Sequence, residues 1–317
     1  MSSNLTVRLG EYLETRRRFG FDLGTSARVL RRFVQFADDE NASHVTTDLF
    51  LRWQRRFGSA SNNTWAARLG MVRGFANWLE MIDPHTEVPP PGLISGKFRR
   101  ARPYIYSPEE ISEIVSRTAR LPSAYGLRGL TFATMFGLIA VSGLRINEAI
   151  RLDDADVDLD NAVLTIKLGK NGKARLVPVA ADVAERLRAY RAECVRIHGA
   201  GHTPFFRTDV GTRPTDCAAR YNFALVSQRT GLRKADQFYK HGCGPRVHDL
   251  RHTFAVRTII EWYRKGLDPD REMHTLSTYL GHLNPEHTYW YIEAVHELLQ
   301  LASERAGQSL QRNGGKA

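Results

Sequence analysis

The residues best suited to chemistry in this chain of 317 residues are cations and aromatic hydroxyls. His248 and Arg251 lie three positions apart in the segment HDLRH, so on a helix both side chains leave the same face. A titratable imidazole beside a permanent guanidinium suits chemistry on phosphate esters. By itself the pair is equally compatible with a partly buried structural histidine, because histidine burial is intermediate.

A further candidate cation is Arg145 in the segment SGLRINE, where a glycine turn leads into a predicted helix. Free backbone N–H groups at a helix start can hold an anion together with a guanidinium. When the segment is considered alone, an ordinary surface arginine at a helix start is the simpler explanation.

Two lysines, Lys170 and Lys173, lie in the segment GKNGK between predicted strands at 162–168 and 174–179. The Asn-Gly pair predicts a β-hairpin with its turn in this segment. Flexible lysines at such a tip would suit insertion into a groove of nucleic acid. The simpler explanation is that turns are exposed and that lysine is soluble there.

Two more signals lie near the C-terminal end of the chain. Gly281 predicts a helix C-cap, and His282 follows it directly. Tyr289 and Tyr291 are two positions apart, so they lie on different faces of a helix, and at most one can face a site formed by other elements. Packing in an aromatic core is the commoner fate of such a residue.

The histidines and cysteines do not form a metal-binding pattern. His274, His282 and His287 lack the HExxH spacing, and no carboxylate or cysteine completes a recognisable set. The three cysteines form no CxxC pair, which argues against a cysteine zinc site and a disulfide framework and fits a reducing cytoplasm. We therefore expect no metal and no cofactor.

The overall composition is that of a folded, basic protein. Lys+Arg number 45 and Asp+Glu number 34, which leaves a formal net charge of +11. Such an excess favours a polyanion partner, with nucleic acid as the default and a merely basic enzyme as the alternative. The most apolar run, Leu130 to Val141, is too short to span a bilayer and predicts a buried helix instead. The first residues lack the apolar core of a signal peptide, so no membrane association is expected.

The helical periodicity divides the chain into two regions. Residues 1–82 predict helices only, at about 25–37 with Thr25 as N-cap, at about 47–57 and at about 62–81. Prolines and arginines in 83–103 predict an extended basic linker. Residues 104–317 predict a larger mixed domain in which Ser107-Pro108-Glu109-Glu110 starts the first helix. Helices follow to about Val141 and, after the hairpin, at about 181–198, 214–230, 247–265, 271–281 and 285–305.

The order of these residues along the chain, Arg, Lys, His-x-x-Arg, His and Tyr, resembles the tyrosine recombinases, the phage-integrase family that includes the bacterial Xer-like enzymes. The segments RVHDLRHTFA and LGHLNPEHTYWY carry the resemblance, which covers about Tyr104 to Ala306. It implies a mainly α catalytic domain with a small antiparallel β-sheet (α+β). The all-α region 1–82 is similar in layout to the core-binding, SAM-like, DNA-binding domain of the family.

The resemblance also implies roles for individual residues. Tyr291 matches the nucleophile, with Tyr289 as the alternative, and Lys170 matches the general acid, with Lys173 as the alternative. Glu148 matches an acid that supports the site, and His248 is the expected base for the phenol. The six positions that match the catalytic set are Arg145, Lys170, His248, Arg251, His282 and Tyr291.

DNA contacts are expected from both regions and from the linker. Three arginines share the polar face of the first predicted helix, and Leu51 to Leu79 contains five arginines and no acid. Charges of one sign repel unless a partner neutralises them. The candidates are Arg28, Arg31, Arg32, Arg68, Arg73, Arg99, Arg100 and Lys173.

The implied activity is site-specific recombination of double-stranded DNA through a 3′-phosphotyrosyl intermediate. The implied assembly is a homotetramer on two DNA sites, assisted in some systems by accessory proteins, in the cytoplasm at the nucleoid. Integration, excision, transposition and dimer resolution all remain open. The segment 296–306 is expected either to bind a neighbouring copy or to pack on its own domain. A non-catalytic DNA-binding accessory protein and a type IB-like topoisomerase are the alternatives.

Overall fold

The computed structural model describes residues 4–21, 23–97, 102–167, 174–234, 244–281, 284, 286–294 and 297–304. The chain divides into two compact units, Met1–Ala101 and Arg102–Ala317. Each unit has a hydrophobic core of its own.

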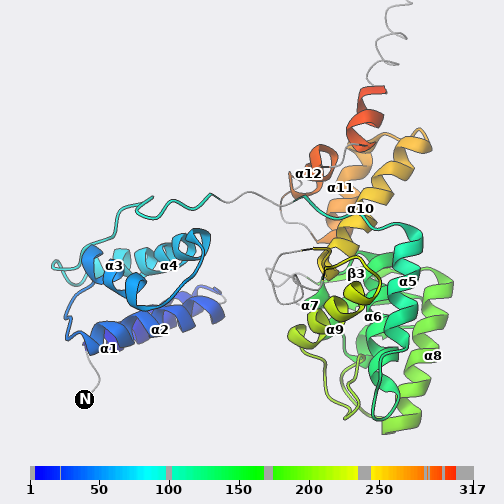
Figure 1. The fold of residues 1–317 in the computed structure, drawn as a ribbon, viewed down its shortest axis with the longest axis horizontal. Coiled ribbons are helices and arrows are strands. Elements are labelled where there is room, and N and C mark those ends of the chain that lie inside the picture. Colours follow the sequence, from blue (N-terminus) through cyan, green and yellow to red (C-terminus); the bar gives the residue numbers. More distant parts are fainter. Residues whose placement is uncertain are drawn as a thin grey trace, which may run out of the picture. The chain divides into compact units, whose positions relative to one another are not determined.

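The first unit is helical, as predicted (Figure 1). Its core is rich in aromatic rings, with Trp53 in edge-to-face contact with both Phe33 and Trp65. Such contacts stabilise a small core beyond the area they bury. The helices are α1 (Asn4–Arg18), α2 (Gly24–Asp39), α3 (Thr47–Arg56) and α4 (Asn62–Glu80).

One cap and one boundary in this region differ from the prediction. Helix α2 begins at Gly24 behind Leu23, with no side-chain cap, so Thr25 lies inside its first turn. Leu23 packs against the core instead, which fixes the entry of the chain. The predicted linker also begins later than expected, because Val88 and Ile94 pack against the core of the first unit. Prolines prevent a helix there but do not prevent apolar side chains from packing.

The second unit has the predicted fold class, mainly helical with a small antiparallel sheet (Figure 1). The strands β1 (Val157–Asp158), β2 (Val163–Ile166) and β3 (Arg175–Pro178) form a sheet in that order, with Leu164 opposite Val157 and Val177. The tip of the predicted hairpin lies outside the described residues. The helices are α5 (Pro108–Ala119), α6 (Leu127–Ser142), α7 (Ile146–Arg151), α8 (Ala181–His198), α9 (Asp216–Arg229), α10 (Val247–Arg264), α11 (Pro269–Leu280) and α12 (Glu286–Ala294). Residues 297–304 are also helical.

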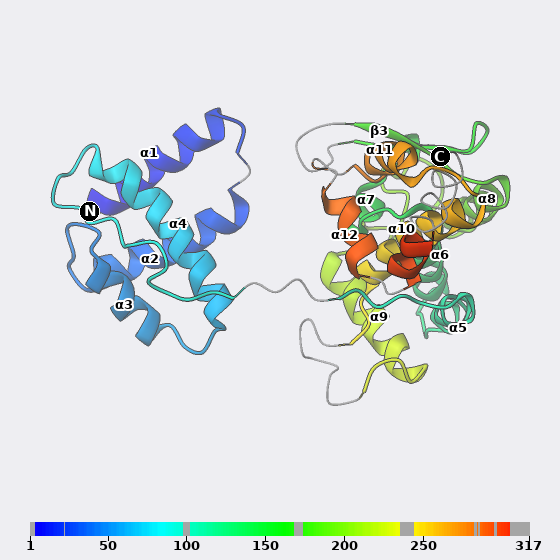
Figure 2. The same ribbon diagram turned by 90° about the horizontal axis from the view of Figure 1, so that it is seen from above.

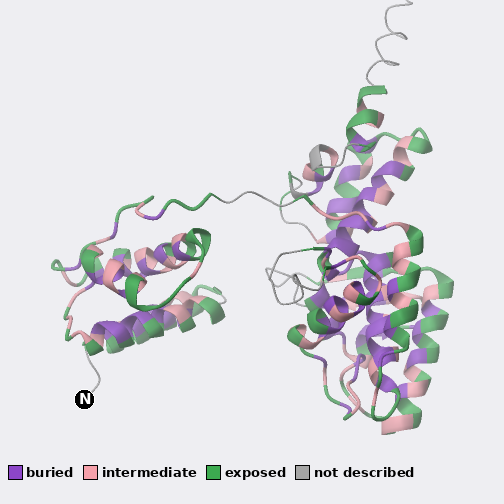
Figure 3. Ribbon diagram, in the orientation of Figure 1, coloured by how far each residue is buried: buried purple, intermediate pink, exposed green. Residues whose placement is uncertain are grey.

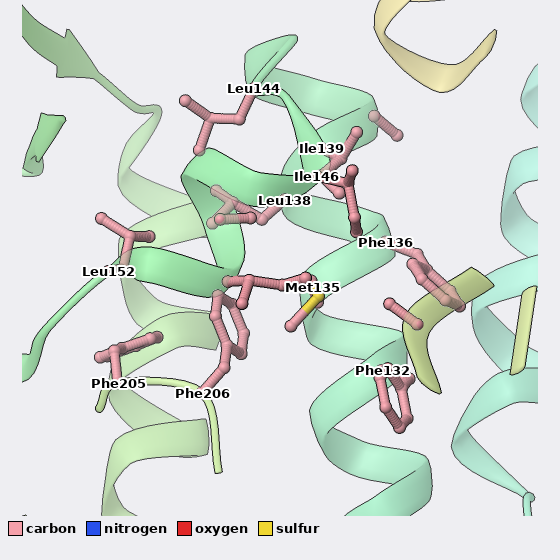
Figure 4. Close-up of a cluster of buried hydrophobic side chains, with 14 of the residues drawn as sticks. Phe132, Met135, Phe136, Leu138, Ile139, Leu144, Ile146, Leu152, Phe205 and Phe206 are labelled. Atoms are coloured by element: carbon pink, nitrogen blue, oxygen red, sulfur yellow. The ribbon is translucent and has the colours of Figure 1, made fainter. Parts of the chain in front are cut away.

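Helix α6 lies at the centre of the core of the second unit. Its side chains Phe132, Met135 and Ile139 point into a cluster that also contains Leu152 and Phe206 (Figure 4). Burial is concentrated along α6 and α10 (Figure 3). The buried helix predicted around 130–141 is therefore correct. Within the described ranges, no helix is long and apolar enough to cross a membrane.

Two local features of the second unit concern the start of its first helix and the packing of the helices that carry candidate site residues. Ser107 caps α5 in a capping box with Glu110, as its sequence predicted. Helices α11 and α12 contact each other, and both contact α10 (Figures 1 and 2). Helix α12, which carries Tyr291, is thus brought against α10, which carries His248 and Arg251.

Replacing Gly129 by alanine should destabilise the second unit. A Cβ atom at Gly129 would lie 2.5 Å from the backbone oxygen of Ala119, where α5 and α6 cross closely. Backbone atoms cannot move away cheaply, so we expect a loss of about 1–3 kcal/mol in the free energy of unfolding. Gly137→Ala is the matched control, because its nearest neighbour would be Val115 Cγ2 at 3.9 Å. Urea unfolding followed by circular dichroism would contradict the prediction if both variants changed stability equally.

Candidate active site

The site is built around the C-terminal ends of two helices. Gly143 ends α6 and Gly281 ends α11, both in the left-handed conformation, with φ of 63° and 65°. Glycine adopts this conformation at no steric cost. The last carbonyl groups of a helix carry partial negative charge and have no partner within the helix, so they attract cations.

Arg251 uses both helix ends. It lies on α10 with 1% of its surface exposed, and its Nη1 donates to the Gly143 carbonyl and its Nη2 to the Leu280 carbonyl, both at 2.7 Å. Burial, followed by the nearby charge of Arg145, lowers the pKa of Arg251 to about 10. The guanidinium therefore stays cationic at neutral pH and is held in one orientation.

Arg145 reaches the same end of α11 from the N-cap position of α7. Its Nη2 donates to the Gly281 carbonyl at 3.0 Å, and its Nη1 lies 3.4 Å from the Leu280 carbonyl that also accepts from Arg251. Two guanidinium groups from segments more than a hundred residues apart are thus brought side by side.

A buried carboxylate, Glu148, compensates this concentration of positive charge. Its oxygens accept from Arg145 Nη1 at 2.8 Å and from Arg175 Nη1 and Nη2 at 3.0 and 2.8 Å, and Arg251 Nη1 lies 3.9 Å away. Burial raises the pKa of Glu148, but the hydrogen bonds and charge of Arg175 and Arg145 outweigh it and bring the pKa to about 2. Glu148 is therefore ionised at any physiological pH.

Arg175, at the start of β3, was not predicted from the sequence. Besides Glu148, it donates through Nε to the Tyr279 carbonyl at 2.8 Å, so it ties the hairpin to α11. A Cβ atom at Gly281 would lie 2.8 Å from Arg175 Nη1, so the glycine also makes room for this arginine. Only its position next to the hairpin lysines could have drawn attention to it.

Tyr291 lies beside these cations, on α12. Only 1% of it is exposed, its phenol oxygen lies 2.9 Å from His252 Nδ1, and it is close enough to Arg251 that a phenolate there would raise the pKa of the guanidinium. Tyr289 has 39% of its surface exposed and donates to Asp270 at 3.4 Å. The two tyrosines thus lie on different helix faces, as expected, and Tyr291 is the one that faces the arginines.

Two histidines stand one helical turn apart on α10. His248, in the first turn, is open to solvent, and its ring meets that of His252 edge to face at 4.6 Å between centroids. Partial loss of hydration, followed by the charge of Arg251, lowers the pKa of His248 to about 4. His248 is therefore neutral at pH 7 in the absence of DNA. His252 was missed by the sequence analysis, although its i,i+4 spacing from His248 predicts a shared face.

Several predicted site residues lie outside the described residues. They are Lys170, Lys173, His282, Arg99 and Arg100.

The candidate DNA contacts of the first unit have different environments. Arg28 and Arg31 are exposed on α2. Arg32 and Arg68 both lie over the ring of Phe57, with guanidinium carbons 5.6 and 5.7 Å from its centroid. Arg73 donates to the Pro89 carbonyl in the segment that packs on this unit.

The run of five arginines between 51 and 79 is less unbalanced in the structure than in the sequence. Arg52 pairs with Glu40 and Asp48, and Arg56 pairs with Glu40. Acids at the end of α2 and in the first turn of α3 therefore neutralise part of the charge without a partner molecule.

No group of three or more histidine, cysteine, aspartate or glutamate side chains suited to a metal ion occurs in the part of the chain that the structure describes. The arginine charges gather around Glu148 and the Leu280 carbonyl, and Tyr291 interacts electrostatically with Arg251.

Comparison with known proteins gives consistent matches over both units. Residues 107–297 match the Phage integrase family. A Sinorhizobium fredii protein named as integrase/recombinase y4rB is 41% identical over 302 residues, which cover 93% of this chain and 94% of that protein. The tyrosine recombinase XerA of Thermococcus kodakarensis is 26% identical, over 87% of this chain and 86% of XerA.

Solved structures show the same fold. A XerH site-specific recombinase bound to a difH substrate aligns with a TM-score of 0.63 at 19% identity, over 89% of this chain and 78% of XerH. The Tn1549 transposon integrase in complex with transposon right end DNA aligns with a TM-score of 0.62 at 14% identity, over 95% of this chain and 98% of the integrase. Together with the geometry around Tyr291, these matches show that the chain belongs to the phage integrase family of tyrosine recombinases, enzymes that cut and rejoin DNA.

Proposed function

We propose that this protein recombines specific sites in double-stranded DNA and that Tyr291 is the residue that attacks the phosphate. The observation that carries the proposal is the placement of Arg145 and Arg251 at one end of α11, with the buried phenol of Tyr291 close enough to Arg251 to interact with its charge. Attack by the phenol oxygen breaks the bond from phosphorus to the 5′ oxygen and leaves a 3′-phosphotyrosyl bond. That diester conserves the bond energy needed to rejoin the strand.

The two arginines supply the electrostatic part of the mechanism. A pentavalent phosphate gathers negative charge on its non-bridging oxygens, and planar guanidinium groups present donors in a matching geometry. Their contacts with the helix ends hold Arg145 and Arg251 in place before the phosphate arrives. A preorganised donor of this kind typically lowers a barrier by about 3–4 kcal/mol.

The remaining roles follow from the family resemblance. Lys170, or Lys173 in its place, protonates the leaving 5′ oxygen, and His282 donates a hydrogen bond to the phosphate. His248 was expected to accept the proton of the phenol. Its open position in the first turn of α10 is equally suited to meeting a phosphate oxygen. Fixed cations carry the charge in this scheme, so it needs no metal or cofactor.

Strand exchange requires more than one copy of the chain. The free 5′ hydroxyl of a second duplex attacks the phosphotyrosyl bond, so we propose that four copies act on two DNA sites. Accessory proteins are proposed to assist assembly on DNA at the nucleoid of the cytoplasm. Of the two fates expected for residues 296–306, packing on their own domain is supported, because Leu298 is buried and Leu301 packs in a cluster formed with α10 and α11 of the same copy. Support comes from relatives named as recombinases and from a solved transposon integrase on transposon DNA. The accessory-protein and topoisomerase alternatives are not favoured by these names.

Tyr291→Phe should abolish a covalent adduct that the unaltered protein forms with DNA. The probe is a pool of nicked duplexes with randomised sequence, in which cleavage beside the nick releases a short fragment and prevents rejoining. Adducts that survive denaturing electrophoresis are recovered and sequenced, which also identifies the site. Tyr289→Phe is the matched control and should keep the adduct, because that hydroxyl contacts Asp270 at the surface. Absence of any adduct with the unaltered protein would contradict the proposed function.

Glu148→Gln should destabilise the protein and weaken cleavage, because three guanidinium groups would lose their buried counter-charge. The pKa of Glu148 falls from 4.5 to about 2 on folding, so its charge contributes stability that is present above pH 4.5 and lost as the pH falls through about 2. This difference corresponds to about 3 kcal/mol. We expect the gap in unfolding free energy between the two proteins to close between these pH values. Glu193→Gln, at an exposed pair with Arg196, is the control and should show no such gap.

Replacing Arg28, Arg31 and Arg32 together by alanine should weaken DNA binding by the first unit. Each lost phosphate contact should reduce the slope of log affinity against log salt by about 0.9. Fluorescence anisotropy with the selected duplex at several salt concentrations measures both quantities. Arg18→Ala is the control, because Arg18 pairs with Glu14 on α1. An unchanged salt slope in the triple variant would show that these three arginines of α2 do not contact DNA phosphates.

A further inference from the structure

The phenol of Tyr291 is hydrogen-bonded to a histidine that the family motif does not assign to catalysis. The Tyr291 oxygen lies 2.9 Å from His252 Nδ1, and only 6% of His252 and 1% of Tyr291 are exposed. The rings meet at 5.4 Å between centroids, and Trp290 borders the histidine at 5.9 Å. The contact is therefore formed inside the protein, where water does not compete for it.

The direction of this hydrogen bond is set by the tautomer of His252. When the ring proton lies on Nε2, Nδ1 accepts, and the phenol, which is protonated at neutral pH, donates. In this tautomer, His252 Nδ1 lies at the distance that proton transfer from a nucleophile requires.

The surroundings of the two histidines suit them to different roles. His248 is exposed in the first turn of α10, where a DNA phosphate can approach, whereas His252 is buried one turn further on, against Tyr291. Arg251 lies between them in sequence, and its positive charge favours the phenolate.

We propose that His252, rather than His248, is the base that accepts the proton of Tyr291. The inference rests on the proposed function and names a further catalytic residue for it. As the phenol oxygen bonds to phosphorus, its O–H bond breaks and an Nδ1–H bond forms, while the bond from phosphorus to the 5′ oxygen breaks and that oxygen takes a proton from the general acid. In rejoining, the 5′ hydroxyl returns its proton to the general acid as its oxygen bonds to phosphorus, and the departing Tyr291 oxygen recovers the proton from the His252 imidazolium.

The cost of this step is a second positive charge beside Arg251. It arises while a phosphate with its own negative charge enters the same site, so the imidazolium, Arg145 and Arg251 then share one anion. The transfer is consequently coupled to DNA binding, and the phenol remains protonated without DNA.

The test uses the full-length protein and the nicked duplex recovered with it. His252→Asn keeps an oxygen near the position of Nδ1, so it can accept the hydrogen bond but not the proton. We expect single-turnover cleavage to slow by about 10²–10⁴, the usual contribution of a general base. His248→Asn is the matched variant and should slow cleavage without the response to phenol acidity described next. Thermal unfolding and DNA affinity of both variants verify that the fold is intact.

Fluorinated tyrosine at position 291 separates a base from a positioning residue. Fluorine lowers the pKa of the phenol and so reduces its need for a base. We expect fluorination to accelerate His252→Asn much more than it accelerates the unaltered protein or His248→Asn. Cleavage by His252→Asn at the rate of the unaltered protein would overturn the proposal, as would an equal effect of fluorination on all three proteins. A failure of the proposed function is distinguishable, because the unaltered protein would then form no adduct at all.

Discussion

The site depends on one compensated cluster of charge: Glu148 buried against Arg145 and Arg175, with Arg251 nearby. Three guanidinium groups in so small a volume would repel one another, and removing them from water is costly. One carboxylate and the carbonyl groups at two helix ends satisfy them together. The net charge left at the site is positive, which is what a phosphate in its transition state requires.

The end of α6 links the packing of the core to the positions of the two arginines. Gly143 must turn sharply to end α6, and a Cβ atom there would lie 2.5 Å from Phe254. That turn carries the chain to Arg145, and its carbonyl group holds Arg251. The packing of α6 in the core therefore sets the distance between the two arginines, so core stability and catalytic geometry are linked.

Much of this arrangement could be predicted from the sequence, wherever a local pattern or a family motif encodes it. The fold class, the buried helix at 130–141 and the start of α5 at Ser107 followed from periodicity and capping signals. The cap at Thr25 was wrong, because packing of Leu23 outweighed a local capping preference. Arg175 could not be predicted, since its importance arises from a contact with Glu148 that joins β3 to α7, and no local pattern encodes such a contact.

His252 shows a different limit of motif-based reasoning. A motif identifies residues by their position in a family, and His248 occupies the position that the family pattern assigns. The structure places His252 Nδ1 within hydrogen-bond distance of the phenol oxygen, so distance favours His252 as the group that accepts the proton. Neutral at pH 7 and exposed, His248 is instead suited to donate a hydrogen bond to a phosphate, whose negative charge would raise its pKa again. One helix can thus supply both a donor to the phosphate and an acceptor for the nucleophile, because a spacing of four residues puts the two rings on one face, a full turn apart.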